Sequence, residues 1–108
     1  MSADLLDLAR LRVAATAAVA DLKLLANPER LLLLCQLSQG ECSVGELEIL
    51  LDIHQPTLSQ QLGVLRTEGV VATRRRGKQI FYRVADQTLL QVLAALYLIY
   101  CPAGGSDE

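Results

Sequence analysis

The sequence is poor in aromatic residues and has no long apolar run. Its 108 residues include three tyrosines, one phenylalanine and no tryptophan. The core must therefore be aliphatic, which favours helices packed on helices. No segment reaches the roughly 18 uninterrupted apolar residues that a membrane span needs. Asp4 and Asp7 stand where a signal peptide carries basic residues, so we expect a cytoplasmic protein without membrane contact.

Histidine and cysteine are also scarce, which limits catalytic and metal chemistry. The chain has one histidine, His54, and three scattered cysteines, Cys35, Cys42 and Cys101. Such cysteines are too few for a disulfide scaffold, and we expect them to be reduced thiols. The sequence also lacks a nucleophile elbow, a phosphate-binding glycine loop and a Cys-x-x-Cys pair. We therefore expect neither an enzyme nor a bound cofactor.

Charge is sparse as well, but it is segregated along the chain. Charged residues make up 20% of the sequence and the net charge is −2. Between His54 and Arg83, six basic residues stand against one acidic residue, Glu68, which gives a local charge of +5. The rest of the chain carries −7. A basic face of this kind can meet phosphate, while acidic surface elsewhere limits non-specific binding.

Local signals predict a mostly α-helical domain over residues 1–101 with one small β-hairpin, followed by a flexible tail at 102–108. Asn27 with Pro28, Ser43 with Glu46, and Asp86 are expected helix starts. Gly69 is placed to end a helix. We expect helices over 3–25, 27–40, 43–51, 56–68 and 86–100, and hairpin strands over 70–74 and 80–84.

Two short helices joined by a tight turn and followed by a basic hairpin are typical of a winged helix-turn-helix, of order α-α-α-α-β-β-α. Its second short helix would read DNA, and the hairpin, or wing, would meet phosphate or the minor groove. Gln61 also belongs to the polar face of this helix. The candidate DNA-binding residues are His54, Gln55, Thr57, Ser59, Gln60 and Arg66 in and before the helix, and Arg74, Arg75, Arg76 and Lys78 in the wing.

Each of these features also has a plainer interpretation. A polar helix face is often only solvated, and so is a run of surface charge. Some winged helices bind protein and never touch DNA. The basic hairpin directly after the helix-turn-helix favours DNA binding over these alternatives.

The last predicted helix is apolar on every side. From Leu89 to Cys101 the strongly polar side chain is Gln91, apart from two tyrosine hydroxyls. One domain can cover a single face of such a helix, so a partner has to cover the other. We expect a homodimer formed by this helix and the first one. Two recognition helices about 34 Å apart could then read successive major grooves of operator DNA.

Four motifs of the chain form a recognisable set. They are Leu25-Ala-Asn-Pro-Glu-Arg-Leu31, Ser43-Val-Gly-Glu-Leu47, Gln55-Pro-Thr-Leu-Ser-Gln-Gln-Leu-Gly-Val-Leu-Arg66 and Arg76-Gly-Lys-Gln-Ile-Phe-Tyr-Arg83. Together they resemble the ArsR/SmtB repressors over roughly residues 10 to 101. The resemblance implies a winged-helix homodimer that occupies promoter DNA and releases it when an inducer binds.

The metal sites of that family do not match this sequence. One family site has a Cys-Val-Cys pattern in the third helix, where this chain has Ser43 and Gly45. Another uses Asp and His residues of the last helix, where this chain has Asp86 but no histidine. Soft metal ions need thiolate or imidazole ligands at close spacing. We therefore expect no metal at either place.

Within the family, the chain resembles the persulfide-sensing branch of the BigR/SqrR type. That branch has one cysteine in the second helix and one at the end of the last, which Cys35 and Cys101 match. The resemblance implies that reactive sulfur species, as inducer, crosslink the two thiols and stop DNA binding. Some relatives with these cysteines act as anti-silencers, so the regulatory sign stays open. A sensor of peroxide or electrophiles, or of a metalloid, is an alternative on the same scaffold.

Overall fold

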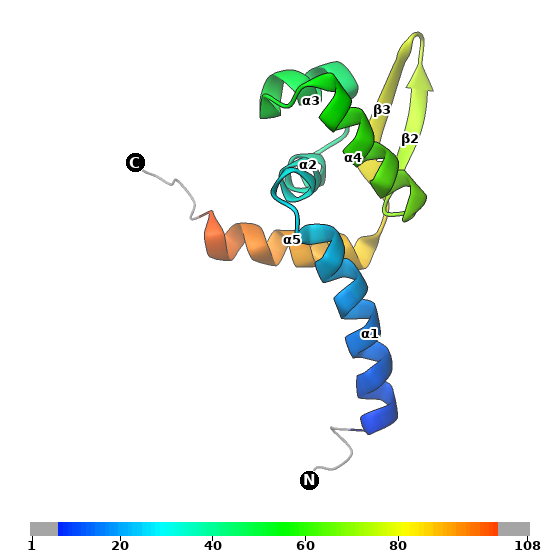
Figure 1. The fold of residues 1–108 in the computed structure, drawn as a ribbon, viewed down its shortest axis with the longest axis vertical. Helices are drawn as coiled ribbons and strands as arrows, with labels where there is room; N and C mark the ends of the chain where they lie inside the picture. The colour runs from blue at the N-terminus through cyan, green and yellow to red at the C-terminus, as the bar shows by residue number, and fades with distance from the viewer. Residues whose placement is uncertain (1–6, 102–108) are drawn as a thin grey trace.

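The computed structural model describes residues 7–101 and has five helices and three short strands (Figure 1). Their order confirms the predicted winged helix-turn-helix. The predicted helical residues 3–6 and the predicted tail at 102–108 lie outside the described residues. The elements are α1 (Leu8–Leu25), α2 (Pro28–Ser38), β1 (Cys42–Ser43), α3 (Val44–Leu51), α4 (Gln55–Thr67), β2 (Val71–Arg76), β3 (Gln79–Val84) and α5 (Gln87–Tyr100).

The predicted caps start three of the helices. The Asn27 side chain accepts hydrogen bonds from the backbone N–H groups of Glu29 and Arg30, at 3.0 and 3.1 Å. Ser43 and Glu46 form a reciprocal capping box before α3. The Asp86 carboxylate accepts from the N–H of Leu89 at 3.0 Å. These contacts satisfy N–H groups that have no partner within the helix.

The wing is longer and its turn tighter than predicted. Arg75 pairs with Ile80 and Arg76 with Gln79, so both arginines belong to β2 and not to the turn. Gly77 makes this possible, because its φ of 64° suits the first position of a two-residue hairpin turn. The turn is thereby reduced to Gly77 and Lys78.

A third strand, β1, joins the hairpin and was not predicted. The sheet order is β1-β3-β2, with Cys42 opposite Tyr82 and Ser43 opposite Phe81. Two residues are too few to show strand alternation, and their partners lie about forty positions along the chain. Only the fold brings them together.

The core is aliphatic, as the composition predicts. Tyr82 is the one aromatic residue of the chain in it, and α2 lies at its centre, in contact with α1, α3, α5 and β3 (Figure 1). No helix within residues 7–101 is long and apolar enough to cross a membrane. The side chains with almost no exposed surface are Leu33, Leu34, Leu47, Leu58, Leu62, Leu65, Leu89 and Leu93.

Candidate functional site

Helix α4 has one buried and one exposed face. Leu58, Leu62 and Leu65 fix the helix in the core. Most of the predicted reading side chains then lie on the opposite face, and the Ser59 hydroxyl donates to the amide oxygen of Gln55. His54, Gln55, Ser59, Gln60 and Arg66 are exposed, and Thr57 is half-buried.

Gln61 differs from its neighbours, because it is half-buried and turned toward α2. Its side-chain oxygen accepts a hydrogen bond from the Arg30 guanidinium at 3.3 Å. The sequence predicted Gln61 to lie on the polar, DNA-facing side of the helix. This contact places it on the inner side of α4 instead. The sequence gives no sign of the contact, since the two residues are 31 positions apart.

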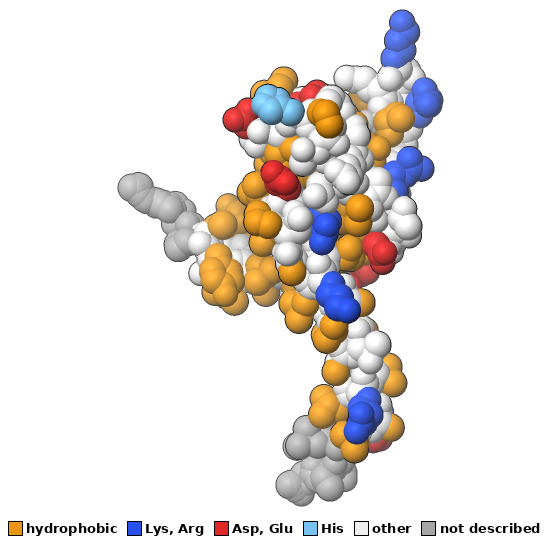
Figure 2. Space-filling view, viewed as in Figure 1, with side chains coloured by type: hydrophobic (Ala, Val, Ile, Leu, Met, Phe, Trp, Pro, Cys, Tyr) orange, Lys and Arg blue, Asp and Glu red, His pale blue; other side chains and the backbone are white. Residues whose placement is uncertain are grey.

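The wing extends away from the helices and has basic side chains along it, as Figure 2 shows. Arg75, Arg76 and Lys78 are exposed at or beside the tip. Their position allows them to approach an anion without first losing a protein contact that the structure records. They are therefore available to phosphate.

Arg74 lies further from the tip and already has an acidic partner. Its Nη2 is 2.7 Å from Oε1 of Glu41, and its Nε donates to Oε2 at 2.8 Å. The guanidinium also lies over the Phe81 ring, 5.0 Å from its centroid. The hydrogen bond from Arg74 lowers the pKa of the Glu41 carboxyl. Glu41 is thus a charged neighbour of the wing that the sequence did not reveal, because it stands 33 residues before Arg74.

The structure brings Cys35 and Cys101 to the same place. Both line one groove between α2 and α5, although they are distant in sequence. Cys35 is half-buried, Cys101 is exposed, and both are free thiols. Burial raises the pKa of Cys35, and nearby Cys101 raises it further. The other residues of the groove are Pro28, Leu31, Leu32, Leu96, Tyr97 and Tyr100.

Comparison with known proteins identifies the family of this chain. The family described as "Bacterial regulatory protein, arsR family" matches residues 27–73. The biofilm growth-associated repressor of Agrobacterium fabrum is 64% identical over 80 residues, which cover 74% of this chain and 68% of that protein. The transcriptional activator HlyU of Vibrio cholerae is 41% identical over 86 residues, 80% of each chain. This chain belongs to the arsR family of bacterial regulatory proteins.

A solved structure supports the same assignment for the fold. The transcriptional repressor BigR of Xylella fastidiosa superposes with a TM-score of 0.81 at 48% sequence identity, covering 94% of this chain and 98% of that one. As an arsR-family member, the chain is a DNA-binding transcriptional regulator. The family assignment does not by itself identify the inducer.

The positions of the family's metal sites have other uses in this arsR-family chain. The Ser43 hydroxyl accepts from the N–H of Glu46 at 3.2 Å, and the Asp86 carboxylate caps α5. Within residues 7–101, no three His, Cys, Asp or Glu side chains gather closely enough to hold a metal ion. A hydroxyl and a single carboxylate at these two positions are not the thiolate or imidazole ligands that a soft metal prefers.

Cys42 lies apart from the thiol pair. It is buried in β1, and its sulfur is 3.8 Å from the carbonyl oxygen of Gly40. Burial raises its pKa, Glu46 raises it further, and a hydrogen bond with Gln36 opposes these effects in part. A thiol with a raised pKa and little access is a poor nucleophile.

Proposed function

We propose that a homodimer of this chain represses transcription by occupying operator DNA, and that sulfane sulfur releases it by crosslinking Cys35 and Cys101. The observation that carries the proposal is the shared groove: two free thiols from α2 and α5 line one apolar depression. The 64% identity to a repressor, against 41% to an activator, favours repression as the regulatory sign.

The different exposure of the two thiols suggests an order of reaction. Cys101 is exposed, so it attacks the outer sulfur of a hydropersulfide, RSSH, and RSH leaves. Cys35 then attacks the inner sulfur of the Cys101 persulfide, which forms the Cys35–Cys101 disulfide and expels H₂S. If the Cys101 persulfide first takes a second sulfur from another RSSH, with loss of RSH, Cys35 can attack the added sulfur that is bonded to Cys101 Sγ, which forms a trisulfide and expels H₂S. A longer bridge tolerates a wider spacing than a disulfide does.

DNA binding is assigned to α4 and the wing. In this assignment Gln55, Thr57, Ser59 and Gln60 contact base edges, with His54 at the start of the helix. Arg66, Arg75, Arg76 and Lys78 contact phosphate, which fixes the register without reading sequence. Arg74 joins them when phosphate displaces Glu41.

A second copy of the chain is the proposed cover for α1 and the end of α5. Orange side chains mark apolar surface on both helices in Figure 2. Apolar surface of this extent on a small domain indicates an interface. A twofold dimer covers the same patch on each protomer. The exposed side chains are Leu8, Leu11, Val13, Val19 and Leu22 on α1, and Tyr97, Leu98, Ile99 and Tyr100 on α5.

The crosslink is tested by treating reduced protein with an organic hydropersulfide. Mass spectrometry is expected to show peptides containing Cys35 and Cys101 joined through sulfur, with loss of operator binding in a gel shift. Cys35→Ser and Cys101→Ser should bind DNA and ignore the persulfide. Cys42→Ser is the matched control and should respond like the parent.

Two results would contradict the proposal. One is a Cys101→Ser protein that still releases DNA with persulfide. The other is release of the parent by hydrogen peroxide or arsenite at lower concentration than by persulfide, which would assign the same thiols to a different inducer.

A further inference from the structure

Arg30, at the start of α2, makes hydrogen bonds that join three helices. Its Nε donates to the carbonyl oxygen of Leu24 at 2.9 Å, and its Nη2 donates to that of Lys23 at 3.2 Å. Its Nη1 donates to the side-chain oxygen of Gln61 at 3.3 Å. One side chain of α2 therefore holds both the last turn of α1 and the middle of α4.

The end of α1 suits an arginine for two reasons. The last carbonyl groups of a helix have no partner within it, and they form its negative end. A guanidinium has five N–H donors in a fixed plane, so it can serve two adjacent carbonyls and a third acceptor at once. A lysine ammonium lacks this flat fork. The backbone of Arg30 is itself fixed, because its N–H donates to the capping side chain of Asn27.

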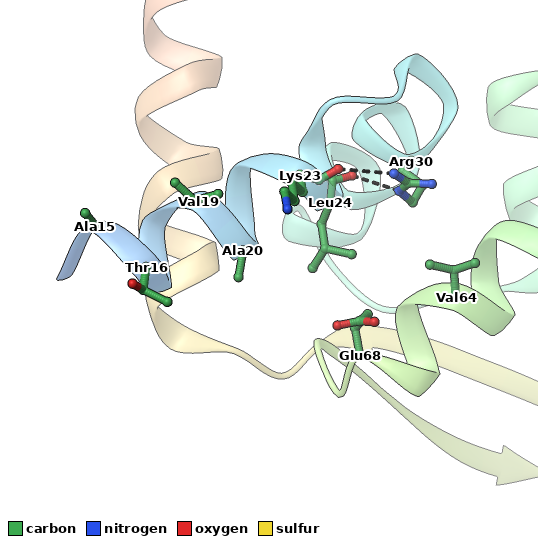
Figure 3. Close-up of a pocket in the computed structure, with 9 residues that line it drawn as sticks. All are labelled: Ala15, Thr16, Val19, Ala20, Lys23, Leu24, Arg30, Val64 and Glu68. Atoms are coloured by element: carbon green, nitrogen blue, oxygen red, sulfur yellow. Dashed lines mark hydrogen bonds between the residues drawn. The ribbon is translucent and has the colours of Figure 1, made fainter. Parts of the chain in front are cut away.

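The space beside Arg30 shows why this bridge matters. A pocket of about 670 Å³ lies between α1 and the second half of α4. In Figure 3, Ala20 and Leu24 of α1 line one side of this pocket, and Val64 of α4 and Glu68 just after it line the other. Arg30 stands at its edge, with its guanidinium directed to the two α1 carbonyls (Figure 3). The three buried leucines hold α4 in the core, and across this open space the hydrogen bonds of Arg30 link α4 to the end of α1.

Gln61 is the neighbour of a side chain assigned to DNA reading. Gln60 is exposed on the outer face of α4, and Gln61 is half-buried on the inner side. Successive residues of a helix are rotated by a fixed angle, so holding Gln61 also fixes the direction in which Gln60 points. Base readout depends on such directions, whereas phosphate attraction does not.

We propose that Arg30 is a positioning residue for DNA reading: through Gln61 it sets the rotation of the recognition helix α4 relative to α1. This inference rests on the proposed reading of operator DNA by α4, and it does not depend on the thiol switch. It assigns to Arg30 a part in sequence discrimination, although its half-buried side chain is directed to the α1 carbonyls and to the inner side of α4.

The test uses reduced protein and a duplex that the parent selects from a random-sequence library. The measured quantity is discrimination, the ratio of the dissociation constant for random duplex to that for selected duplex. Gln61→Leu removes the acceptor, and Arg30→Lys removes the fork. Each should lower discrimination by about fivefold, the effect of one hydrogen bond, with an unchanged salt slope.

Two further variants separate positioning from general destabilisation. Gln61→Glu keeps an acceptor for Arg30, so it should weaken both duplexes but restore discrimination. Gln39→Leu changes an exposed glutamine after α2 and should behave as the parent. The double variant Arg30→Lys/Gln61→Leu should lose no more than either single one, because both act through one contact.

Several outcomes would overturn the inference. Parent-like discrimination in Gln61→Leu would do so, even if Arg30→Lys failed to fold. Additive losses in the double variant would show two independent effects. Lower thermal stability with unchanged discrimination would leave Arg30 a purely structural role. If the parent itself selects no sequence, the proposed function fails first and there is no reading for Arg30 to position.

Discussion

At the scale of single residues, the surroundings of each sulfur decide its chemistry. Cys101 ends α5 and is exposed, Cys35 is half-buried in the groove, and Cys42 is only 7% exposed within β1. Only the thiolate is a strong nucleophile, and burial disfavours the charged form. Three cysteines that look alike in sequence are therefore expected to differ in reactivity.

Alkylation with iodoacetamide should follow the order Cys101, then Cys35, then Cys42. The pKa of Cys35 and of Cys42 is raised, so their thiolate fraction is small at neutral pH. Their rates should rise with pH while the neutral form prevails, and they should level off at a higher pH than the rate of an ordinary thiol does. Peptide mass spectrometry over a pH series measures this. Labelling of Cys42 ahead of Cys101 would contradict the order.

Glu41 is expected to restrain DNA binding through Arg74. Glu41→Gln leaves the guanidinium without its anionic partner, so Arg74 can contact phosphate instead. Affinity for selected and random duplex should rise together, and the slope of log K against log salt should steepen by about 1 per subunit. Glu29→Gln, at the first turn of α2, is the charge-matched control. An unchanged slope would show that Glu41 only positions Arg74.

The Glu41–Arg74 pair also has a predictable dependence on pH. The folded-state pKa of Glu41 is lowered, so its contribution to stability is present above the unfolded pKa and is lost as the pH falls through the folded one. The pair is on the surface, with 47% of the Arg74 and 25% of the Glu41 side chain exposed. Solvent screening therefore keeps this contribution small.

At the scale of elements, sequence signals were sufficient where the cause is local. Asn27 with Pro28, Ser43 with Glu46, and Asp86 each predicted a helix start that the structure confirms, because a cap acts within three residues. Gly69 ends α4 as predicted, with a φ of 76°. The exposed face of α4 followed from its leucine spacing.

What the sequence could not predict depends on contacts between distant segments. β1 is too short to show a pattern, and it exists because β3 offers an open edge. Glu41 and Arg74 are 33 positions apart and Arg30 and Gln61 are 31 apart, so each pair is in contact only in the folded chain. Residue spacing also says nothing about which helices pack side by side. The proximity of Cys35 and Cys101 could therefore be inferred only from the family resemblance.

The wing and the recognition helix should have separable effects on DNA binding. If each subunit neutralises about four phosphates, a dimer gives a log–log salt slope of about −7. Arg75→Ala/Arg76→Ala should flatten that slope and weaken all duplexes alike. Gln60→Ala should leave the slope and reduce discrimination by about 1–3 kcal/mol. Fluorescence anisotropy over a salt series measures both, and an operator affinity insensitive to salt would refute the phosphate assignment.

At the scale of the whole molecule, the shape indicates a missing partner. The described chain measures 56 × 38 × 22 Å, because α1 projects from the body (Figure 1). A projecting helix with exposed Leu11, Val13 and Val19 is poorly covered by its own chain. In the proposed dimer, α1 and α5 bury these side chains and set the spacing of the two recognition helices.

The dimer can be tested with two matched pairs of neutral substitutions. Leu98 and Ile99 on α5 are 76% and 67% exposed, and Ile49 and Leu50 on α3 are 83% and 57% exposed. Leu98→Gln/Ile99→Gln should raise the dimer dissociation constant by more than about a hundredfold, because four apolar side chains per dimer lose their burial. Ile49→Gln/Leu50→Gln should sediment as the parent does. If both double variants sediment alike, the result would contradict the assignment of α5 to the dimer interface.

The double variant Leu98→Gln/Ile99→Gln also tests whether the sulfur crosslink lies within one chain. The groove holds Cys35 and Cys101 of a single protomer, so a monomeric Leu98→Gln/Ile99→Gln protein treated with persulfide should still form the link. It should nevertheless bind the selected duplex weakly before treatment, since one recognition helix reads only one half-site. Non-reducing electrophoresis and mass spectrometry distinguish a link within one chain, which keeps the monomer mass, from a link between two chains, which doubles it. A link that forms only in the dimer would place the two sulfurs on different protomers, and the crosslink would then lock the dimer itself and not the two helices of one chain.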